Sequence, residues 1–249
     1  MDDADDPIKR HAKKLFGSLV DPWPEHDRWS THTRKSIARF LNEFVSNNDR
    51  FQSPADVRLL NVGSHGNAYS LQNGNHFHTD IAEEALTNVS LACVADAERL
   101  PFLNEAFDVV LCVGSVINYC TAARAIGEMG RVLRPGGQLL LEFETSESLE
   151  FALTRDLNKD VTIVRTFYNG SLENLYVYSS RYIAGALNAN GLTIDKSARF
   201  HVVSPLTYRI SRNERFAAIF SFLDNLARKL PGLRNYSANI LLSAQKTQK

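Results

Sequence analysis

The sequence predicts an α/β protein with a seven-stranded, mostly parallel sheet, an antiparallel last strand and helices on both faces. Between residues 56 and 144, short apolar runs alternate with helical patterns, and parallel strands joined by helical crossovers produce that alternation. Beyond residue 144, a hairpin signal and further helix and strand patterns complete the sheet. The chain has 249 residues, of which 44% are hydrophobic and 22% are charged. That composition and length fit one large globular domain with a small appendage.

Residues 1–55 read as a helical N-terminal preface or lid, before a larger domain over residues 56–249. In residues 30–47 the apolar side chains follow helical spacing, which puts them on one face: Ile37, Phe40, Leu41, Phe44 and Val45. The preceding DPWPEHDRW segment is too rich in proline for a helix. Its Trp23 and Trp29 either pin the segment to the main domain or line a substrate pocket.

The first five strands are short apolar runs, and each ends near a turn or a helical pattern. We expect them over residues 57–62, 76–79, 92–95, 107–113 and 138–143. The helix before the fifth strand has the clearest apolar stripe, which contains Ala122, Ala125, Ile126, Met129, Val132 and Leu133. The residues Arg134-Pro135-Gly136-Gly137 stop it.

The chain beyond Glu144 begins with a hairpin, inserted at about residues 160–179. Two β-rich runs flank Asn169-Gly170, the dipeptide that favours tight hairpin turns. Ser180 is expected to cap the next helix, and Gly191 to end it. The remaining pattern predicts a strand over 192–203, a helix over 213–230 and a last strand over 238–245.

Three strand ends carry residues suited to a nucleoside ligand. Gly63 and Gly66 follow the first strand, where a glycine turn lets backbone N–H groups approach a ligand. Asp80 ends the second strand, 17 residues after Gly63, close to the spacing of a ribose-binding acid. Asp96 follows the third strand, where a carboxylate can accept a hydrogen bond from an adenine amine. The three features point into one crevice.

The sequence RVLRPGG at Arg131–Gly137 is similar to the Arg-Val-Leu-x-Pro-Gly-Gly signature of class I S-adenosylmethionine-dependent methyltransferases. The resemblance covers roughly residues 56–144 and implies a Rossmann-like sheet and S-adenosyl-L-methionine as methyl donor. It implies that the donor contacts Asn61, Gly63, Ser64, His65, Gly66, Asp80, Ile81, Asp96, Ala97, Gly114 and Ser115. The family's Asp-x-Gly-x-Gly-x-Gly motif is degenerate, since Asn61, Gly63, His65 and Asn67 stand at its four fixed positions.

Methyl transfer from a sulfonium needs mainly orientation, closeness and exclusion of water. His65, His32 and Tyr119 are the candidates to deprotonate or position an acceptor, although each has an equally plausible structural role. Candidate acceptor contacts are Trp23, Trp29, Asn118, Tyr119 and Tyr168. The segment SVINYC after the fourth strand lacks the Asn-Pro-Pro-Tyr motif of many amino-directed enzymes that act on nucleic acids and proteins. This favours O- or N-methylation of a small molecule.

Besides methyl transfer to a small molecule, three other functions and a metal site have to be considered. Residues 209–234 carry a local charge of +4, which leaves an RNA substrate as the runner-up. The degenerate glycine loop leaves a non-catalytic binding protein possible. The first turn lacks GxGxxG, which disfavours a nicotinamide dehydrogenase. His76, His78 and Asp80 alternate on one strand face, but no fourth ligand is spaced nearby, so we expect no metal.

Charge and cysteine usage point to a cytoplasmic protein without membrane contacts. Lysine plus arginine and aspartate plus glutamate both total 28, so no overall charge attracts polyanions. The acidic start MDDADD lacks the features of a signal peptide. The three cysteines show no CxxC spacing, as is usual for free thiols in a reducing compartment. The pattern leaves the oligomeric state open.

Overall fold

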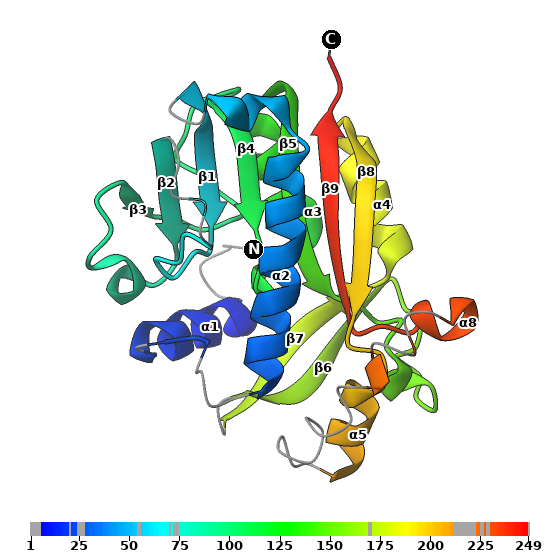
Figure 1. The fold of residues 1–249 in the computed structure, drawn as a ribbon. Helices are drawn as coiled ribbons and strands as arrows, with labels where there is room; N and C mark the ends of the chain where they lie inside the picture. Colours follow the sequence, from blue (N-terminus) through cyan, green and yellow to red (C-terminus); the bar gives the residue numbers. More distant parts are fainter. Residues whose placement is uncertain are drawn as a thin grey trace.

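A computed structural model describes residues 6–19, 21–23, 28–53, 56–69, 71, 75–168, 171–211, 223–224, 227 and 230–248. Its main sheet has seven strands in the order β3-β2-β1-β4-β5-β9-β8 (Figure 1). These strands are β1 (Arg58–Val62), β2 (Asn75–Asp80), β3 (Ala92–Val94), β4 (Phe107–Cys112), β5 (Leu133–Glu144), β8 (Leu192–Phe200) and β9 (Asn239–Lys246). The helices are α1 (Pro7–Ser18), α2 (Arg28–Ser46), α3 (Ala122–Val132), α4 (Ser180–Ala189), α5 (Ser204–Ser211) and α8 (Pro231–Arg234).

Strand directions confirm the predicted sheet. The pairs β1–β2, β1–β4, β2–β3 and β4–β5 are all parallel. The last strand, β9, runs antiparallel to both of its neighbours, β5 and β8. The five strands over residues 58–144 therefore end at one edge of the sheet, toward α1 in Figure 1.

Alternating side chains of the central strands divide the core between two faces, as expected for a sheet covered on both sides. On one face, Leu59 and Val109 pack with Ile37, Phe40 and Leu41 of α2. On the other, Leu60 and Val110 pack with the apolar stripe of α3 and with α4. The predicted helical stripes are thus the faces that cover the sheet.

The first helix, α1, packs against the inserted hairpin below the sheet rather than against the sheet itself (Figure 1). The hairpin consists of β6 (Val161–Tyr168) and β7 (Ser171–Tyr178). Ile8 and Ala12 of α1 form a small core with Leu175 and Val177 of β7. One-turn 3-10 helices connect the larger elements: η2 (Asp49–Gln52), η4 (Glu83–Leu86), η5 (Val116–Tyr119) and η6 (Leu149–Phe151).

Several local details differ from the sequence-based expectations. The sequence did not single out α1, which Pro7 starts and the Asp6 carboxylate caps by accepting from the Ile8 N–H. Ser179, not Ser180, caps α4, since its hydroxyl accepts from the Tyr182 N–H. The fifth strand begins at Leu133, so RPGG lies inside β5 instead of preceding it. Asn169-Gly170 and most of the 213–230 helix lie outside the described residues.

None of the described helices is long and apolar enough to cross a membrane.

Candidate functional site

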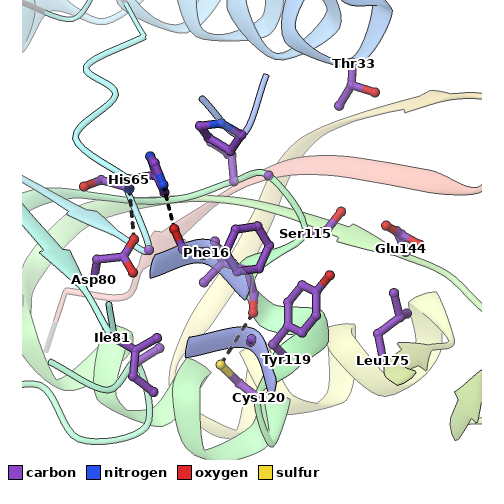
Figure 2. Close-up of a pocket in the computed structure, with 18 of the residues that line it drawn as sticks. Phe16, Thr33, His65, Asp80, Ile81, Ser115, Tyr119, Cys120, Glu144 and Leu175 are labelled. Carbon is purple, nitrogen blue, oxygen red and sulfur yellow. Dashed lines mark hydrogen bonds between the residues drawn. The ribbon is translucent and has the colours of Figure 1, made fainter. Parts of the chain in front are cut away.

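A cavity of about 220 Å³ lies at the carboxyl ends of the central parallel strands. The loops after β1 to β5 supply most of its wall. Lys9, Ala12 and Phe16 of α1 add to it, as do Ser30 and Thr33 of α2. Thr166 and Leu175 come from the hairpin. Figure 2 shows these parts of the chain meeting around one space. The side chains near it thus come from segments far apart in the sequence.

The loop after β1 approaches the loop after β4 too closely for a side chain at Gly63. A Cβ atom there would lie 2.4 Å from a methyl carbon of Val116, and Gly63 has a φ of +64°. His65, with a φ of 44°, is also left-handed. The Asn61 amide donates to the Asn67 carbonyl at 2.7 Å and closes the loop. The degenerate motif therefore still forms a tight turn, with glycine kept where close approach requires it.

Asp80 is buried at the end of β2, and its carboxylate organises the glycine loop. One oxygen accepts from the His65 N–H at 2.9 Å (Figure 2), and the other accepts from the Ala82 N–H at 3.0 Å. The residue is 6% exposed and lines the cavity. Each carboxylate oxygen can accept more than one hydrogen bond, so Asp80 retains acceptor capacity toward a ligand.

Asp96 forms an ion pair with a lysine that the sequence analysis did not single out. Lys9 Nζ lies 2.7 Å from Asp96 Oδ2 and 3.0 Å from Glu98 Oε1. Burial opposes the charge on Lys9, but the hydrogen bonds that its ammonium group donates to Asp96 and Glu98 outweigh this effect and raise the pKa of Lys9. The contact ties α1 to the loop after β3. No local sequence signal joins residues 87 positions apart.

Glu142 holds the loop after β4 in place from a fully buried position. Its Oε2 accepts from the Gly114 N–H at 2.9 Å and the Ser115 N–H at 2.6 Å. Its Oε1 accepts from the Asn239 amide at 2.7 Å. These bonds fix Gly114 and Ser115, whose φ values are +86° and +59°. Buried donors left without such acceptors would be costly.

A second group of residues lines the cavity away from Asp80, and Figure 2 shows Glu144 and Leu175 on the side opposite to Asp80. Tyr119 donates its hydroxyl hydrogen to Glu173 Oε2 at 2.7 Å, and its ring contacts Phe16 edge-to-face at 5.4 Å. Glu144, at the end of β5, lines the same space, and the Ser115 hydroxyl points toward it. Sequence reasoning did not single out Glu144, although its place at a strand end was a usable signal.

Thr33 reaches the cavity from α2 and is anchored by a buried polar cluster. Thr33 Oγ1 lies 2.8 Å from His201 Nε2, and His201 Nδ1 lies 3.2 Å from Ser204 Oγ. Asp224 accepts three backbone N–H groups, from residues 202–204, and the Ser204 hydroxyl. Burial opposes ionisation, but hydrogen bonds from His201, Ser204 and Val203 lower the pKa of Asp224 to about 2.

Burial raises the pKa of Glu144 to about 8, with contributions from the nearby carboxyl groups of Glu142, Glu150 and Glu173. An ordinary glutamic acid titrates near 4.5, so the folded state holds an extra proton between these two values. The free energy of unfolding therefore falls as the pH rises from about 4.5 to about 8. At neutral pH the Glu144 side chain is mainly the neutral acid.

We expect Glu144→Gln to remove this pH-dependent loss of stability. Burial lowers the pKa of His76 to about 4, so His76 makes stability rise with pH between about 4 and 6.5. That opposing effect is common to both proteins and cancels in their difference. Urea unfolding at pH 5 and pH 8 measures that difference. Relative to the parent, the variant should be more stable at pH 8 than at pH 5. If the free energy of unfolding changes equally in both proteins between these pH values, the pKa of Glu144 is not raised.

Most of the expected donor contacts line the cavity. These are Gly63, Ser64, His65, Asp80, Ile81, Asp96, Ala97, Gly114 and Ser115. Asn61 and Gly66 do not line it, and they serve the loop's own hydrogen bonds instead. Of the expected acceptor contacts and catalytic candidates, Trp23, Tyr119 and His65 line the cavity.

The other candidates lie elsewhere. His32 is not among the described lining residues, and its ring lies 4.7 Å from that of His201. Asn118 is buried, and its side chain bonds the Glu144 backbone and the Tyr176 carbonyl. The side chains of Trp29 and Tyr168 lie outside the described part of the chain. Their proximity to the cavity therefore stays a prediction.

His76 and His78 stack on each other, with ring centroids 4.2 Å apart. Burial lowers the pKa of both imidazoles. The described residues contain no group of three or more histidine, cysteine, aspartate or glutamate side chains suited to a metal ion.

Comparison with known proteins gives a family match over the central strands. Residues 60–141 match the family model described as a methyltransferase domain. The match runs from within β1 to within β5 and covers the loops that carry Gly63, Asp80, Asp96 and Gly114.

Curated relatives match over short segments. A ubiquinone/menaquinone biosynthesis C-methyltransferase from Bordetella parapertussis is 45% identical over 67 residues, 25% of this chain and 26% of that protein. A probable tRNA methyltransferase 9B from Homo sapiens is 45% identical over 143 residues, 53% of this chain and 29% of that protein. The matches thus span about a quarter of the length of these relatives.

One solved structure matches over nearly the whole chain. A geranyl diphosphate C-methyltransferase from Streptomyces coelicolor, determined with S-adenosyl-L-homocysteine, aligns with a TM-score of 0.62 and 11% identity. The alignment covers 98% of this chain and 99% of that one. At this identity the likeness concerns the fold, which is the fold of S-adenosylmethionine-dependent methyltransferases.

Proposed function

We propose that this chain, which contains a class I S-adenosylmethionine-dependent methyltransferase domain, transfers a methyl group from S-adenosyl-L-methionine to a small molecule. The observation that carries the proposal is the cavity at the carboxyl ends of β1 to β5, where open α/β sheets bind their ligands. Residues expected to contact the methyl donor, such as Asp80 and Ser115, line one part of this cavity. Trp23 and Tyr119, which are expected to contact the methyl acceptor, line another part.

The residues of the donor part fit S-adenosylmethionine. Gly63 brings the backbone to the cavity where a Cβ atom would collide with Val116. Asp80 would accept from the ribose hydroxyls, and Asp96 from the adenine amine. Gly114 and Ser115, fixed by Glu142, would face the methionine part. When bound, this donor supplies an electrophilic methyl group attached to sulfur.

The helix α1 would serve as a lid over both parts of the cavity. Lys9 pairs with Asp96, and the Phe16 carbonyl lies 3.0 Å from His65 Nε2 (Figure 2). The Phe16 ring meets Tyr119 on the acceptor side. A helix that contacts both sides can exclude water and hold the acceptor in line, which this reaction requires.

The small, covered cavity supports a small acceptor over a nucleic acid. Its described lining has the acidic residues Asp80, Asp96, Glu144 and Glu150 and one lysine, Lys9, which is paired with Asp96. Such a lining disfavours a polyanion. The similarity to a probable tRNA methyltransferase keeps RNA as the second candidate. The basic segment 209–234 that motivated it lies largely outside the described residues.

Transfer of labelled methyl groups tests the proposal. Purified protein is incubated with methyl-labelled S-adenosylmethionine and either a metabolite extract below about 1 kDa or total tRNA. We expect label in the metabolite fraction that depends on Asp96, so Asp96→Asn should lower the rate about tenfold. Label only in tRNA would favour the second candidate. Binding of the donor product without transfer to either fraction would favour a binding protein.

A further inference from the structure

A buried cluster of polar side chains behind the cavity wall ends at the hydroxyl of Thr33, which lines the cavity. The cluster runs from Asp224 through Ser204 and His201 to Thr33, and the first three residues are 0% exposed. Figure 2 shows Thr33 on the side of the cavity opposite to Asp80. The cluster therefore reaches the part of the cavity that lies away from the expected ribose contact.

The hydrogen bonds of the cluster indicate which atom carries each hydrogen. Asp224 accepts from the backbone N–H groups of residues 202–204 and from the Ser204 hydroxyl, so it acts only as an acceptor. Because Ser204 gives its one hydrogen to Asp224 at 2.5 Å, its oxygen accepts from His201 Nδ1 at 3.2 Å. A neutral His201 ring then has a lone pair on Nε2, which accepts from the Thr33 hydroxyl at 2.8 Å. Thr33 Oγ1 keeps its own lone pairs for a donor in the cavity.

The cost of burying this cluster argues for a role besides packing. A buried carboxylate and an imidazole both lose hydration, and apolar side chains of similar volume would hold α2 in place at lower cost. Burial opposes ionisation of Asp224, yet the groups that donate to it lower its pKa to about 2. A charged carboxylate close to a histidine stabilises the imidazolium ion, so His201 is placed to receive a proton.

We propose that the acceptor is a small alcohol or phenol whose hydroxyl donates to Thr33 Oγ1, and that His201 receives its proton through Thr33. The proposal rests on the methyl transfer proposed above and narrows its substrate class. A neutral hydroxyl is a weak nucleophile, and loss of its proton during the transfer lowers the barrier. A neutral amine already has a free electron pair and needs no such base, so a proton relay favours a hydroxyl acceptor.

The proposed step balances in atoms and charge. The acceptor oxygen forms the new bond to the methyl carbon, and the carbon–sulfur bond breaks with its electron pair going to sulfur. The proton of the acceptor hydroxyl passes to Thr33 Oγ1, while the proton of Thr33 passes to His201 Nε2. The products are a methyl ether, S-adenosylhomocysteine and the imidazolium form of His201. The positive charge of the donor therefore ends on His201, close to Asp224.

Replacement of Thr33 tests the relay with little change in shape. Thr33→Val removes the hydroxyl, and we expect methyl transfer into the metabolite extract to slow at least about a hundredfold, a usual contribution of acid–base catalysis. The affinity for S-adenosylhomocysteine should stay at the parent value, and Thr33→Ser should restore most of the rate. Thr193→Val is the matched control, because Thr193 is an exposed residue of β8 outside the described lining.

A double variant tests whether Thr33 and His201 act together. If Thr33 works by passing a proton to His201, Thr33→Val combined with His201→Gln should lose no more rate than the slower of the two single variants. Near-ultraviolet circular dichroism checks that each variant is folded. Losses that multiply in the folded double variant would show that the two residues act separately and would overturn the relay. If His201→Gln does not fold, the comparison of Thr33→Val with Thr33→Ser still decides.

The tautomer of His201 gives a readout that does not depend on turnover. Long-range nitrogen–proton NMR reports which ring nitrogen carries hydrogen under the conditions of the transfer assay. We expect hydrogen on Nδ1 alone. Hydrogen on Nε2 alone, or on both nitrogens, would leave no lone pair for the Thr33 hydroxyl and would rule the relay out.

The atom that receives the methyl group tests the acceptor class. The donor carries a carbon-13 methyl group, and the metabolite extract comes from cells grown on nitrogen-15. NMR then identifies a methyl group on nitrogen by its coupling to nitrogen-15 and one on carbon by its chemical shift. We expect the methyl group on oxygen, and transfer to nitrogen or carbon would overturn the proposed acceptor.

The remaining outcomes separate this proposal from the proposed function. If the parent protein transfers no methyl group to the extract, the methyl transfer itself fails and this proposal falls with it. If the methyl group is on oxygen but folded Thr33→Val keeps the parent rate, or Thr193→Val loses as much, only the role of Thr33 fails. A lower melting temperature of Thr33→Val at the parent rate would show that the cluster merely holds α2 in place.

Discussion

Asp80→Ala should lower the affinity for S-adenosylhomocysteine by at least about tenfold, since hydrogen bonds to a charged group contribute about 1.5 to 3 kcal/mol. Two losses combine. The ribose hydroxyls would lose their acceptor, and the His65 and Ala82 N–H groups would lose the carboxylate that positions the glycine loop. Calorimetric titration of the parent and the variant measures the change.

Two further variants separate those losses. Asp80→Asn keeps one acceptor oxygen for the loop and should fall between the parent and Asp80→Ala. Glu43→Gln, which also replaces a carboxylate but lies outside the cavity, should bind as the parent does. If Asp80→Ala keeps the parent affinity with its fold intact, the ribose does not bind at Asp80.

Removal of residues 1–19 should lower methyl transfer at least about a hundredfold while weakening donor binding much less. The truncation removes Lys9, Ala12 and Phe16 from the wall of the cavity, so water enters and the acceptor loses its alignment, and misplacement of that kind costs rates of this order. Asp96 and Glu98 become solvated when Lys9 leaves, so neither stays buried without a partner. Donor affinity and transfer into the metabolite fraction are measured on the same preparation.

The truncation also exposes the hairpin residues that α1 covers, Leu175 and Val177. Near-ultraviolet circular dichroism must therefore show that the shortened chain is folded. Phe16→Ala is the milder variant, because it keeps the packing of Ile8 and Ala12 and should still reduce transfer. Full transfer by a folded truncated chain would show that α1 is an anchor and not a lid.

The fold was predictable because its signals are local. Leu59 and Leu60 are neighbours in the sequence, and strand geometry alone sends them to opposite faces of the sheet. The spacing of Ile37, Phe40 and Leu41 likewise fixed the buried face of α2. Alternation of these patterns along the chain was enough to predict a mostly parallel sheet.

The residues that bind the methyl donor could also be predicted from local patterns, because parallel strands bring Gly63, Asp80 and Asp96 to one edge of the sheet. The contacts of α1 could not be predicted in this way. Lys9 meets Asp96 across 87 residues, and its sequence neighbourhood looks like any solvated, basic helix. The carboxyl group of Glu173 depends on the docking of a hairpin whose position no local pattern specifies. Packing of inserted segments therefore limits what the sequence reveals about the acceptor.

The position of S-adenosylhomocysteine in a crystal structure of the complex tests the central claim most directly. We predict adenosine in the cavity at the carboxyl ends of β1 to β4, with the ribose hydroxyls within hydrogen-bond distance of Asp80 and the adenine amine beside Asp96. Crystals grown at a saturating concentration with this cavity empty, or with the compound bound elsewhere, would contradict the assignment of the site and of the methyl donor.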